Sequence, residues 1–159
     1  MISMIVCTDT NGGIGAKNDL LFNIKDDMKF FRETTVNKKV VMGYNTWVSL
    51  PKKPLPKREN YVLYDGDEEI EGATVLRNWD EVIELGKENH VFLIGGAMVY
   101  NDALKLDIVD EAFVTWVDAF TEAEVYLDVP ELNMKLIHRD YIRNFEFGNV
   151  KVQLFRYYR

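Results

Sequence analysis

The stretch VFLIGGAMVY, Val91 to Tyr100, joins an apolar run to an amphipathic one through two adjacent glycines. The apolar run is typical of a strand buried on both faces, and AMVYNDALK (97–105) is typical of a helix leaving that strand. Because Gly95 and Gly96 have no Cβ, the free N–H groups at the helix start can face a phosphate. A tight turn before a packed helix explains the same pattern. The stretch therefore predicts a strand–turn–helix unit, with an anion site as its functional interpretation.

A second segment, VVMGYNTW (40–47), repeats this arrangement with a single glycine, Gly43. Tyr44, Asn45 and Thr46 then stand at the start of the short helix. Two such units in one small chain favour a ligand with two phosphates, as in a dinucleotide.

Strands and helices alternate on both sides of these two units. Strands are predicted at 2–8, 38–43, 60–64, 73–77, 90–96 and 111–118, and helices at about 25–34, 44–50, 79–87 and 97–105, with Asn78 capping the third helix. The C-terminal FEFGNVKVQLFRYY (145–158) is typical of a hairpin that turns at Gly148 and Asn149. The pattern predicts one α/β domain over residues 1–159, with a largely parallel sheet, helices on both faces and an antiparallel C-terminal edge.

Composition narrows the possible partners. The chain has 159 residues, with 19 basic and 26 acidic residues and a formal net charge of −7, so a nucleic-acid or anionic-membrane partner is not expected. Cys7 is the one cysteine and His90 and His138 are isolated, so neither a disulfide framework nor a metal site is expected. No apolar run reaches the roughly 20 residues of a membrane span. We expect a cytoplasmic protein, with a monomer as the default state.

Two adjacent aspartates stand in LLFNIKDDMKFF (20–31). If this segment is a helix, its inward stripe consists of Ile24, Met28, Phe31 and Thr35, which lie within about 40° of one another around the helix axis. One aspartate, Asp27, lies about 75° from the centre of this stripe, and the other, Asp26, lies about 175° from it. The first, Asp27, is expected at the boundary of the core, and the second, Asp26, in solvent. Alternatively, both simply suit a helix N-terminus. Burial would raise the pKa of Asp27, whereas a hydrogen-bond-donating ligand would favour its charged form.

Arg58 follows the proline-stiffened PKKPLPK (51–57), where its guanidinium could hold a carboxylate bidentately or simply be solvated.

Six segments, in order along the chain, resemble the dihydrofolate reductase family: MISMIV, GIGAKNDLLFNIKDDMKFF, KKVVMGYNTWVSL, PLPKREN, LIGGAMVY and FVTWVDA. The resemblance implies an eight-stranded, mostly parallel sheet with about four flanking helices. It also implies hydride transfer from C4 of a reduced nicotinamide to C6 of dihydrofolate, with protonation at N5, in one-carbon metabolism.

The resemblance assigns roles near the substrate. Asp27 would bind the 2-amino and N3 side of the pterin and support protonation, with Thr115 bonded to it and Phe22 beside it. Arg58 would hold the glutamate α-carboxylate. The other substrate-binding positions implied are Ile5, Val6, Met28, Phe31, Leu50, Leu55 and Ile94.

The implied cofactor is NADPH. The family's cofactor-binding positions fall here on Cys7, Ile14, Gly15, Asn18, Leu20, Gly43, Tyr44, Asn45, Thr46, Leu63, Tyr64, Asp65, Arg77, Gly95, Gly96, Ala97, Met98, Val99 and Tyr100. Gly15 and Asn18 lie in the segment that closes over nicotinamide in the family.

The chain departs from the family at three places. A proline–tryptophan pair is replaced by Leu21-Phe22, which removes an indole N–H beside the substrate, and the acid that braces the mobile segment is Glu124. Where NADPH-dependent members carry basic residues for the 2′-phosphate, this chain has Tyr44, Asp65 and Met98. A carboxylate there suits a ribose 2′-OH, so we expect appreciable NADH use, with Arg77, Lys38 or Lys39 as the remaining candidate cations.

Two other functions share parts of this pattern. The pyrimidine reductase of riboflavin synthesis has the same fold but does not need Asp27, Phe31 and Arg58 together. A folate- or nucleotide-binding module without turnover is consistent with Leu21-Phe22.

Overall fold

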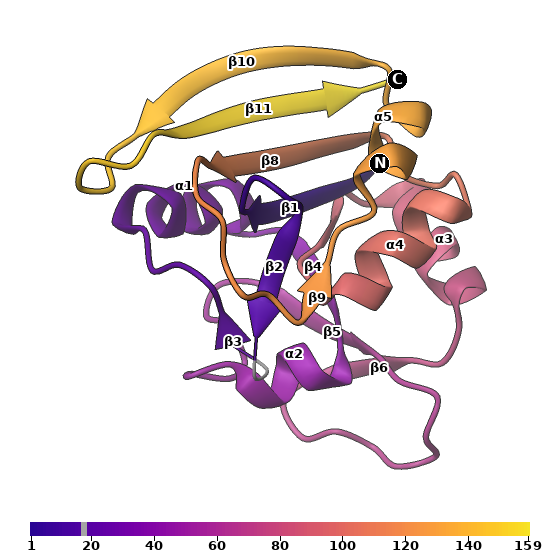
Figure 1. Ribbon diagram of the computed structural model, residues 1–159. Helices are drawn as coiled ribbons and strands as arrows, with labels where there is room; N and C mark the ends of the chain where they lie inside the picture. The colour runs from indigo at the N-terminus through magenta and orange to yellow at the C-terminus, as the bar shows by residue number, and fades with distance from the viewer. Residues whose placement is uncertain (17–18) are drawn as a thin grey trace.

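The computed structural model describes residues 1–16 and 19–159 and is built around one eight-stranded sheet (Figure 1). The strand order is β10-β11-β8-β1-β7-β4-β5-β6. The strands are β1 (Ile2–Thr8), β4 (Lys39–Gly43), β5 (Glu59–Leu63), β6 (Thr74–Leu76), β7 (Val91–Leu93), β8 (Glu111–Val117), β10 (His138–Phe145) and β11 (Val152–Tyr158).

The sheet is mostly parallel, as predicted. All neighbouring pairs from β8 to β6 run parallel, whereas β11 pairs antiparallel with both β8 and β10. The predicted hairpin turn is confirmed at Gly148, whose φ of 54° is left-handed. The carboxyl ends of β1, β4, β7 and β8 therefore meet at one edge of the sheet, where ligands of such folds bind.

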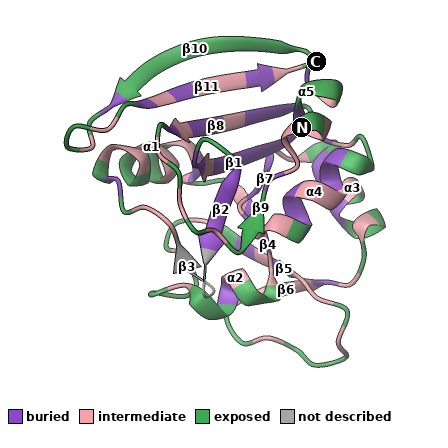
Figure 2. Ribbon diagram, in the orientation of Figure 1, coloured by how far each residue is buried: buried purple, intermediate pink, exposed green. Residues whose placement is uncertain are grey.

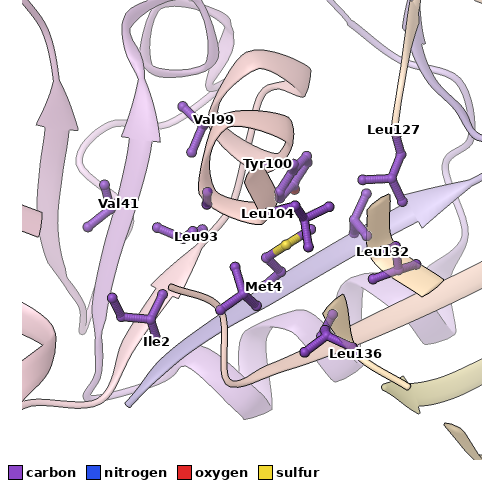
Figure 3. Packing of buried hydrophobic residues seen from close by; sticks show 14 of the residues in the cluster. Ile2, Met4, Val41, Leu93, Val99, Tyr100, Leu104, Leu127, Leu132 and Leu136 are labelled. Carbon is purple, nitrogen blue, oxygen red and sulfur yellow. The ribbon is translucent and has the colours of Figure 1, made fainter. Parts of the chain in front are cut away.

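Helices cover both faces of the sheet. The core on one face, which includes Met4, Leu93, Leu104 and Leu132, is covered by α3 (Trp79–Glu88), α4 (Ala97–Lys105) and α5 (Val129–Lys135) (Figure 3). On the other face, α1 (Lys25–Thr35) and α2 (Tyr44–Ser49) pack over β1, β4, β5 and the hairpin. Burial is concentrated on the central strands, while edge strand β10 is exposed along nearly its whole length (Figure 2).

The region from 9 to 20, for which the sequence predicted no strand or helix, contains short strands. It contains β2 (Gly13–Ala16) and β3 (Asp19–Leu20), which form a small antiparallel sheet with β9 (Val125–Tyr126). These strands are only two to four residues long, and β2 pairs with β9 across more than 100 residues of sequence, so the alternation of apolar residues in a short window does not indicate them.

Helix α5 was also not predicted, which makes five helices in the described residues. Its start does carry a sequence signal, because Asp128 accepts a hydrogen bond from the N–H of Glu131 at 3.2 Å and Pro130 occupies the first turn. Asn78 caps α3 in the predicted way, accepting from the N–H of Glu81 at 3.0 Å.

No helix in residues 1–16 and 19–159 has the length and apolar character needed to cross a membrane. The same residues contain no cluster of three or more His, Cys, Asp or Glu side chains that could hold a metal ion.

Candidate active site

Asp27 lies in the first turn of α1, half-buried, with its carboxylate directed at the carboxyl end of β8. The hydroxyl of Thr115 donates to Asp27 Oδ1 at 2.7 Å. Burial raises the pKa of Asp27, while hydrogen bonds from Thr115 and from the Cys7 thiol act in the opposite direction. The result is a desolvated carboxyl with fixed donors, which keeps its proton to a higher pH than a solvated aspartate does.

Cys7 reaches Asp27 because it is the register partner of Thr115 on the adjacent parallel strand β1. Register partners point to the same face of a sheet, so both side chains approach the carboxylate together. Burial, reinforced by the nearby Asp27 charge, raises the pKa of the Cys7 thiol. The thiol therefore stays protonated and serves as a donor, not as a nucleophile.

Asp26 has a different environment, although it is not simply solvated as predicted. Its Oδ2 accepts a hydrogen bond from the backbone N–H of Glu146 at 2.8 Å, at the exposed end of the β10–β11 hairpin. The two adjacent carboxylates thus point to different parts of the molecule, and only Asp27 meets the strand ends.

The predicted inward stripe of α1 is correct at three of its four positions. Ile24 and Thr35 are buried and Phe31 is partly buried, but Met28 is 51% exposed. The helix is rotated so that Phe30 packs on Phe113 instead, with ring centroids 5.6 Å apart. Met28 is therefore not a core residue, and its role toward substrate remains a prediction.

Most of the predicted substrate wall comes together. A single apolar cluster contains Ile5, Phe31, Leu50, Leu55 and Ile94. Val6 does not join it, because alternation along β1 directs its side chain into the core on the opposite face. Only the backbone of Val6 can contribute to this side of the sheet.

Arg58 lies beside this cluster. Its guanidinium is 5.8 Å from the Phe31 ring centroid and donates to Thr35 Oγ1 at 3.1 Å and to the Pro56 carbonyl at 2.9 Å. Burial and the neighbouring guanidinium of Arg32 lower the pKa of Arg58. Arg32 was not predicted from the sequence, and two adjacent guanidinium groups favour an anionic ligand group here.

The two glycine units meet at the ends of β4 and β7. The N–H of Gly43 donates to the carbonyl of Gly95 at 2.8 Å, and Gly43 and Gly96 are the N-cap residues of α2 and α4. A Cβ at Gly95 or Gly96 would lie 3.4 Å from Thr46 Oγ1, so side chains there would crowd the space between the two helix starts. The peptide bond between Gly95 and Gly96 is cis.

Several predicted cofactor residues have side chains committed to packing. Tyr100 donates its hydroxyl to the Ile5 carbonyl at 2.7 Å, and Ile14, Leu63, Ala97 and Val99 contribute to the core beneath α4. Gly15 pairs with β9, and its carbonyl accepts from the N–H of Glu124 at 2.8 Å. These residues can face a ligand through backbone groups or partly exposed edges.

Two predicted positions have little or no description. Asn18 lies outside the described residues, and for Leu20 only the backbone position in β3 is described.

The predicted 2′-phosphate region is aromatic and acidic. Tyr44 stacks on Tyr64 with centroids 4.8 Å apart, and the Tyr64 hydroxyl donates to Glu68 Oε2 at 2.8 Å. Asp65 and Asn45 are exposed, and Met98 is 76% exposed. Glu68 was missed from sequence, because its contact with Tyr64 depends on how the 65–72 turn folds back.

Arg77 is already engaged in this turn. Its guanidinium donates to the carbonyls of Gly66, Asp67 and Glu68 and pairs with Glu69 at 3.5 Å. The other two candidate cations are in the wrong place: Lys39 begins β4 and pairs with Glu59, and Lys38 precedes it, at the opposite edge of the sheet from the glycine units. The expectation that either lysine could reach a 2′-phosphate is therefore wrong.

Phe22 packs by its edge against Phe147, with centroids 6.0 Å apart at 83°. It belongs to the apolar cluster that also holds Cys7 and Ile24. Phe22 thus closes the Asp27 side of the site with hydrocarbon and offers no hydrogen-bond donor.

Comparison with known proteins gives one consistent result. A family model described as dihydrofolate reductase matches residues 1–159. Dihydrofolate reductase of Ureaplasma parvum serovar 3 is 31% identical over 147 residues, covering 91% of this chain and 93% of that protein, and the Bacillus subtilis enzyme is 33% identical over 141 residues, covering 86% and 82%. The solved structure of Enterococcus faecalis dihydrofolate reductase, complexed with NADP(H) and RAB-propyl, superposes with a TM-score of 0.84 at 21% identity, covering 100% of this chain and 96% of that one.

Proposed function

The chain belongs to the dihydrofolate reductase family, and we propose that Asp27, Thr115 and the apolar cluster beside them perform that family's reaction here. The enzyme reduces 7,8-dihydrofolate to tetrahydrofolate with a reduced nicotinamide dinucleotide. The observation that supports these roles best is the half-buried Asp27 carboxylate held by Thr115 at 2.7 Å, at the strand ends where the glycine units also meet.

The reaction needs a proton at the pterin as well as a hydride. Asp27 is the acid of the described site placed to bind the pterin amine and to favour protonation at N5, because burial raises its pKa. Thr115 fixes the orientation of the carboxylate. With Phe22 providing no donor, a proton reaches N5 from Asp27 or through water bound by it.

Substrate binding follows from the rest of the cluster. Phe31, Leu50 and Leu55 supply an apolar surface for the aminobenzoyl ring. Arg58, with Arg32 nearby, supplies the positive charge for the glutamate α-carboxylate.

The cofactor site fits a dinucleotide. Gly43, Gly95 and Gly96 leave two helix starts free of Cβ atoms at the same strand ends, which suits a pyrophosphate. When bound there, the reduced nicotinamide supplies the hydride. The named complex of the Enterococcus faecalis relative supports NADPH as the cofactor class.

NADH use is the finer part of this proposal. Tyr44, Asp65 and Met98 carry no positive charge, and Arg77 is engaged by the 65–72 turn. A 2′-phosphate would therefore add little to the binding free energy of the cofactor, whereas carboxylates can accept a hydrogen bond from a 2′-OH. Equilibrium binding of both reduced dinucleotides, followed by nicotinamide fluorescence, should give dissociation constants within about tenfold of each other. Tight binding of NADPH alone would refute this point and leave the reductase assignment intact.

The reductase assignment has its own test. Dihydrofolate-dependent loss of the near-ultraviolet absorbance of reduced nicotinamide should be rapid with at least one cofactor. A binding module would show no oxidation, and a pyrimidine reductase would act on a ribitylated aminopyrimidine and leave dihydrofolate unchanged. A cytoplasmic monomer without nucleic-acid or membrane partners remains a prediction.

A further inference from the structure

A second buried carboxylate, outside the roles assigned above, follows directly after β1. Asp9 is fully buried and accepts four hydrogen bonds. Its Oδ1 accepts from the backbone N–H groups of Asn11 at 2.8 Å and Gly13 at 2.7 Å. Its Oδ2 accepts from the N–H of Thr121 at 3.2 Å and from the Thr121 hydroxyl at 2.5 Å. A carboxylate so completely bonded in the interior has a fixed position.

These four donors belong to two segments that are far apart in sequence. Asn11 lies in the β1–β2 connection and Gly13 begins β2, whereas Thr121 lies in the β8–β9 connection, 112 residues from Asp9. Backbone bonds reinforce the same contact, from Thr10 N–H to the Ala119 carbonyl at 3.0 Å and from Leu127 N–H to the Gly12 carbonyl at 2.8 Å. Asp9 is therefore the buried side chain that links the two connections.

The contact between the two connections leaves no room for a side chain at Gly13. A Cβ there would lie 2.6 Å from the Ala123 Cβ and 2.8 Å from Asp9 Oδ2. None of the ion pairs among the described residues involves Asp9, and its four hydrogen bonds come from three peptide N–H groups and one hydroxyl. Because all four donors bond the same carboxylate, the loss of one donor should weaken the hydrogen bonds from the others.

The segment held in this way leads into the active site. Gly13 begins β2, which continues to Ile14 and Gly15, and the chain then reaches Phe22 and the helix that carries Asp27. We propose that the Asp9–Thr121 link is a positioning element of the reductase, holding β2 against β9 so that Ile14 and Gly15 are in place at the nicotinamide end of the site. This inference rests on the proposed function. Asp9 and Thr121 act through β2 and do not touch the reacting atoms.

A positioning role for the Asp9–Thr121 link predicts a specific change in the kinetics. Losing the link should slow hydride transfer and weaken binding of the reduced cofactor, because β2 is less well placed. Binding of dihydrofolate should change little, because Asp27, Phe31 and Arg58 lie on other elements. A residue that only stabilised the fold would change neither property selectively.

Thr121→Val removes the hydroxyl donor with little change of volume, and Thr121→Ser retains it. Thr10→Val is the matched control, since the Thr10 hydroxyl donates to the Val117 carbonyl at 3.4 Å in the same pair of connections without touching Asp9. Single-turnover hydride transfer should slow roughly tenfold in Thr121→Val, the lower end for one lost hydrogen bond to a charged group, and should be restored in Thr121→Ser. Thr10→Val should resemble the unmodified protein.

A second measurement does not depend on turnover. Amide hydrogen exchange at Asn11 and Gly13, followed by NMR, should accelerate in Thr121→Val and not in Thr10→Val. Unchanged exchange at both amides would overturn the link itself, whatever the enzyme's substrate. Faster exchange with unchanged hydride transfer, or a parallel loss of dihydrofolate binding, would overturn its positioning role. If Thr121→Val does not fold, Thr121→Ala, which also lacks the hydroxyl donor, is compared with Thr121→Ser in the same exchange measurement and should show the faster exchange.

Discussion

The two ends of the proposed site are built in different ways. At the pterin end, Asp27 is held by Thr115 and Cys7, which stand on neighbouring strands of the central sheet. At the adenosine end, Tyr44 at the start of α2 stacks on Tyr64, and Tyr64 bonds Glu68 of the exposed 65–72 turn. Groups on the sheet are fixed by the core, whereas turn residues can change without cost to folding. We therefore propose that the chemistry of the family is retained here while recognition of the cofactor's 2′ position has diverged.

The largest expected effect is at the pterin end. Asp27→Asn should lower kcat/KM for dihydrofolate at neutral pH by about a hundredfold or more, the usual range for loss of a general acid. Asp26→Asn is the matched control, because Asp26 bonds the hairpin and not the strand ends. Steady-state assays of both variants test this prediction, and equal losses would contradict the assignment of Asp27, and not Asp26, to the pterin end.

The next effect is a gain of function at the adenosine end. Tyr44→Arg combined with Asp65→Ser removes one acid and adds a guanidinium where the family binds the 2′-phosphate. The ratio of kcat/KM for NADPH to that for NADH should rise about 10- to 100-fold, as expected for a charged hydrogen bond of roughly 1.5–3 kcal/mol. Tyr44→Phe, which keeps the ring stack without adding charge, should leave the ratio unchanged. An unchanged ratio in the double variant would show that the 2′-phosphate binds at a different place.

A smaller effect should distinguish the two possible roles of Arg77. If Arg77 organises the 65–72 turn, as its bonds to three carbonyls indicate, Arg77→Met should raise KM for both cofactors by a similar factor of about three to ten. A rise in KM confined to NADPH would instead show that Arg77 leaves the turn to bind the phosphate.

The smallest effect concerns stability. Because burial raises the pKa of Asp27 in the fold, the folded chain keeps a proton at a pH where the unfolded chain has lost it. The fold therefore loses stability as pH rises through that interval, and Asp27→Asn should be the more stable protein above it. Thermal unfolding should show a higher Tm for the variant at neutral pH, with ~1 kcal/mol corresponding to about 2–4 °C. The gain should vanish near about pH 3, below the usual aspartate pKa. A lower Tm for the variant at neutral pH would contradict the account of a desolvated carboxyl.

The sequence was sufficient for the main sheet and for the pterin end. Helical spacing separated Asp27 from Asp26, and strand–glycine–helix patterns located both units that meet at Gly43 and Gly95. It failed at Met28 and Val6, because a helix can rotate by a fraction of a turn and a strand residue next to a correct one faces the other side.

The features missed altogether depend on contacts between distant segments. The β2–β9 pairing, the Asp9–Thr121 link and the carbonyl partners of Arg77 each join residues 9 to more than 100 positions apart, often through backbone atoms. Side-chain patterns in a short window carry no information about such pairings. They emerge only when the chain is folded.

The most direct test of the central claim is the ratio of kcat/KM for NADPH to kcat/KM for NADH, measured with dihydrofolate as the common substrate. An intact pterin end, combined with an adenosine end whose described candidate cation, Arg77, is engaged by the 65–72 turn, predicts turnover with both cofactors and a ratio within about tenfold of one. A ratio of a thousand or more, equivalent to about 4 kcal/mol of selection for the 2′-phosphate, would contradict it.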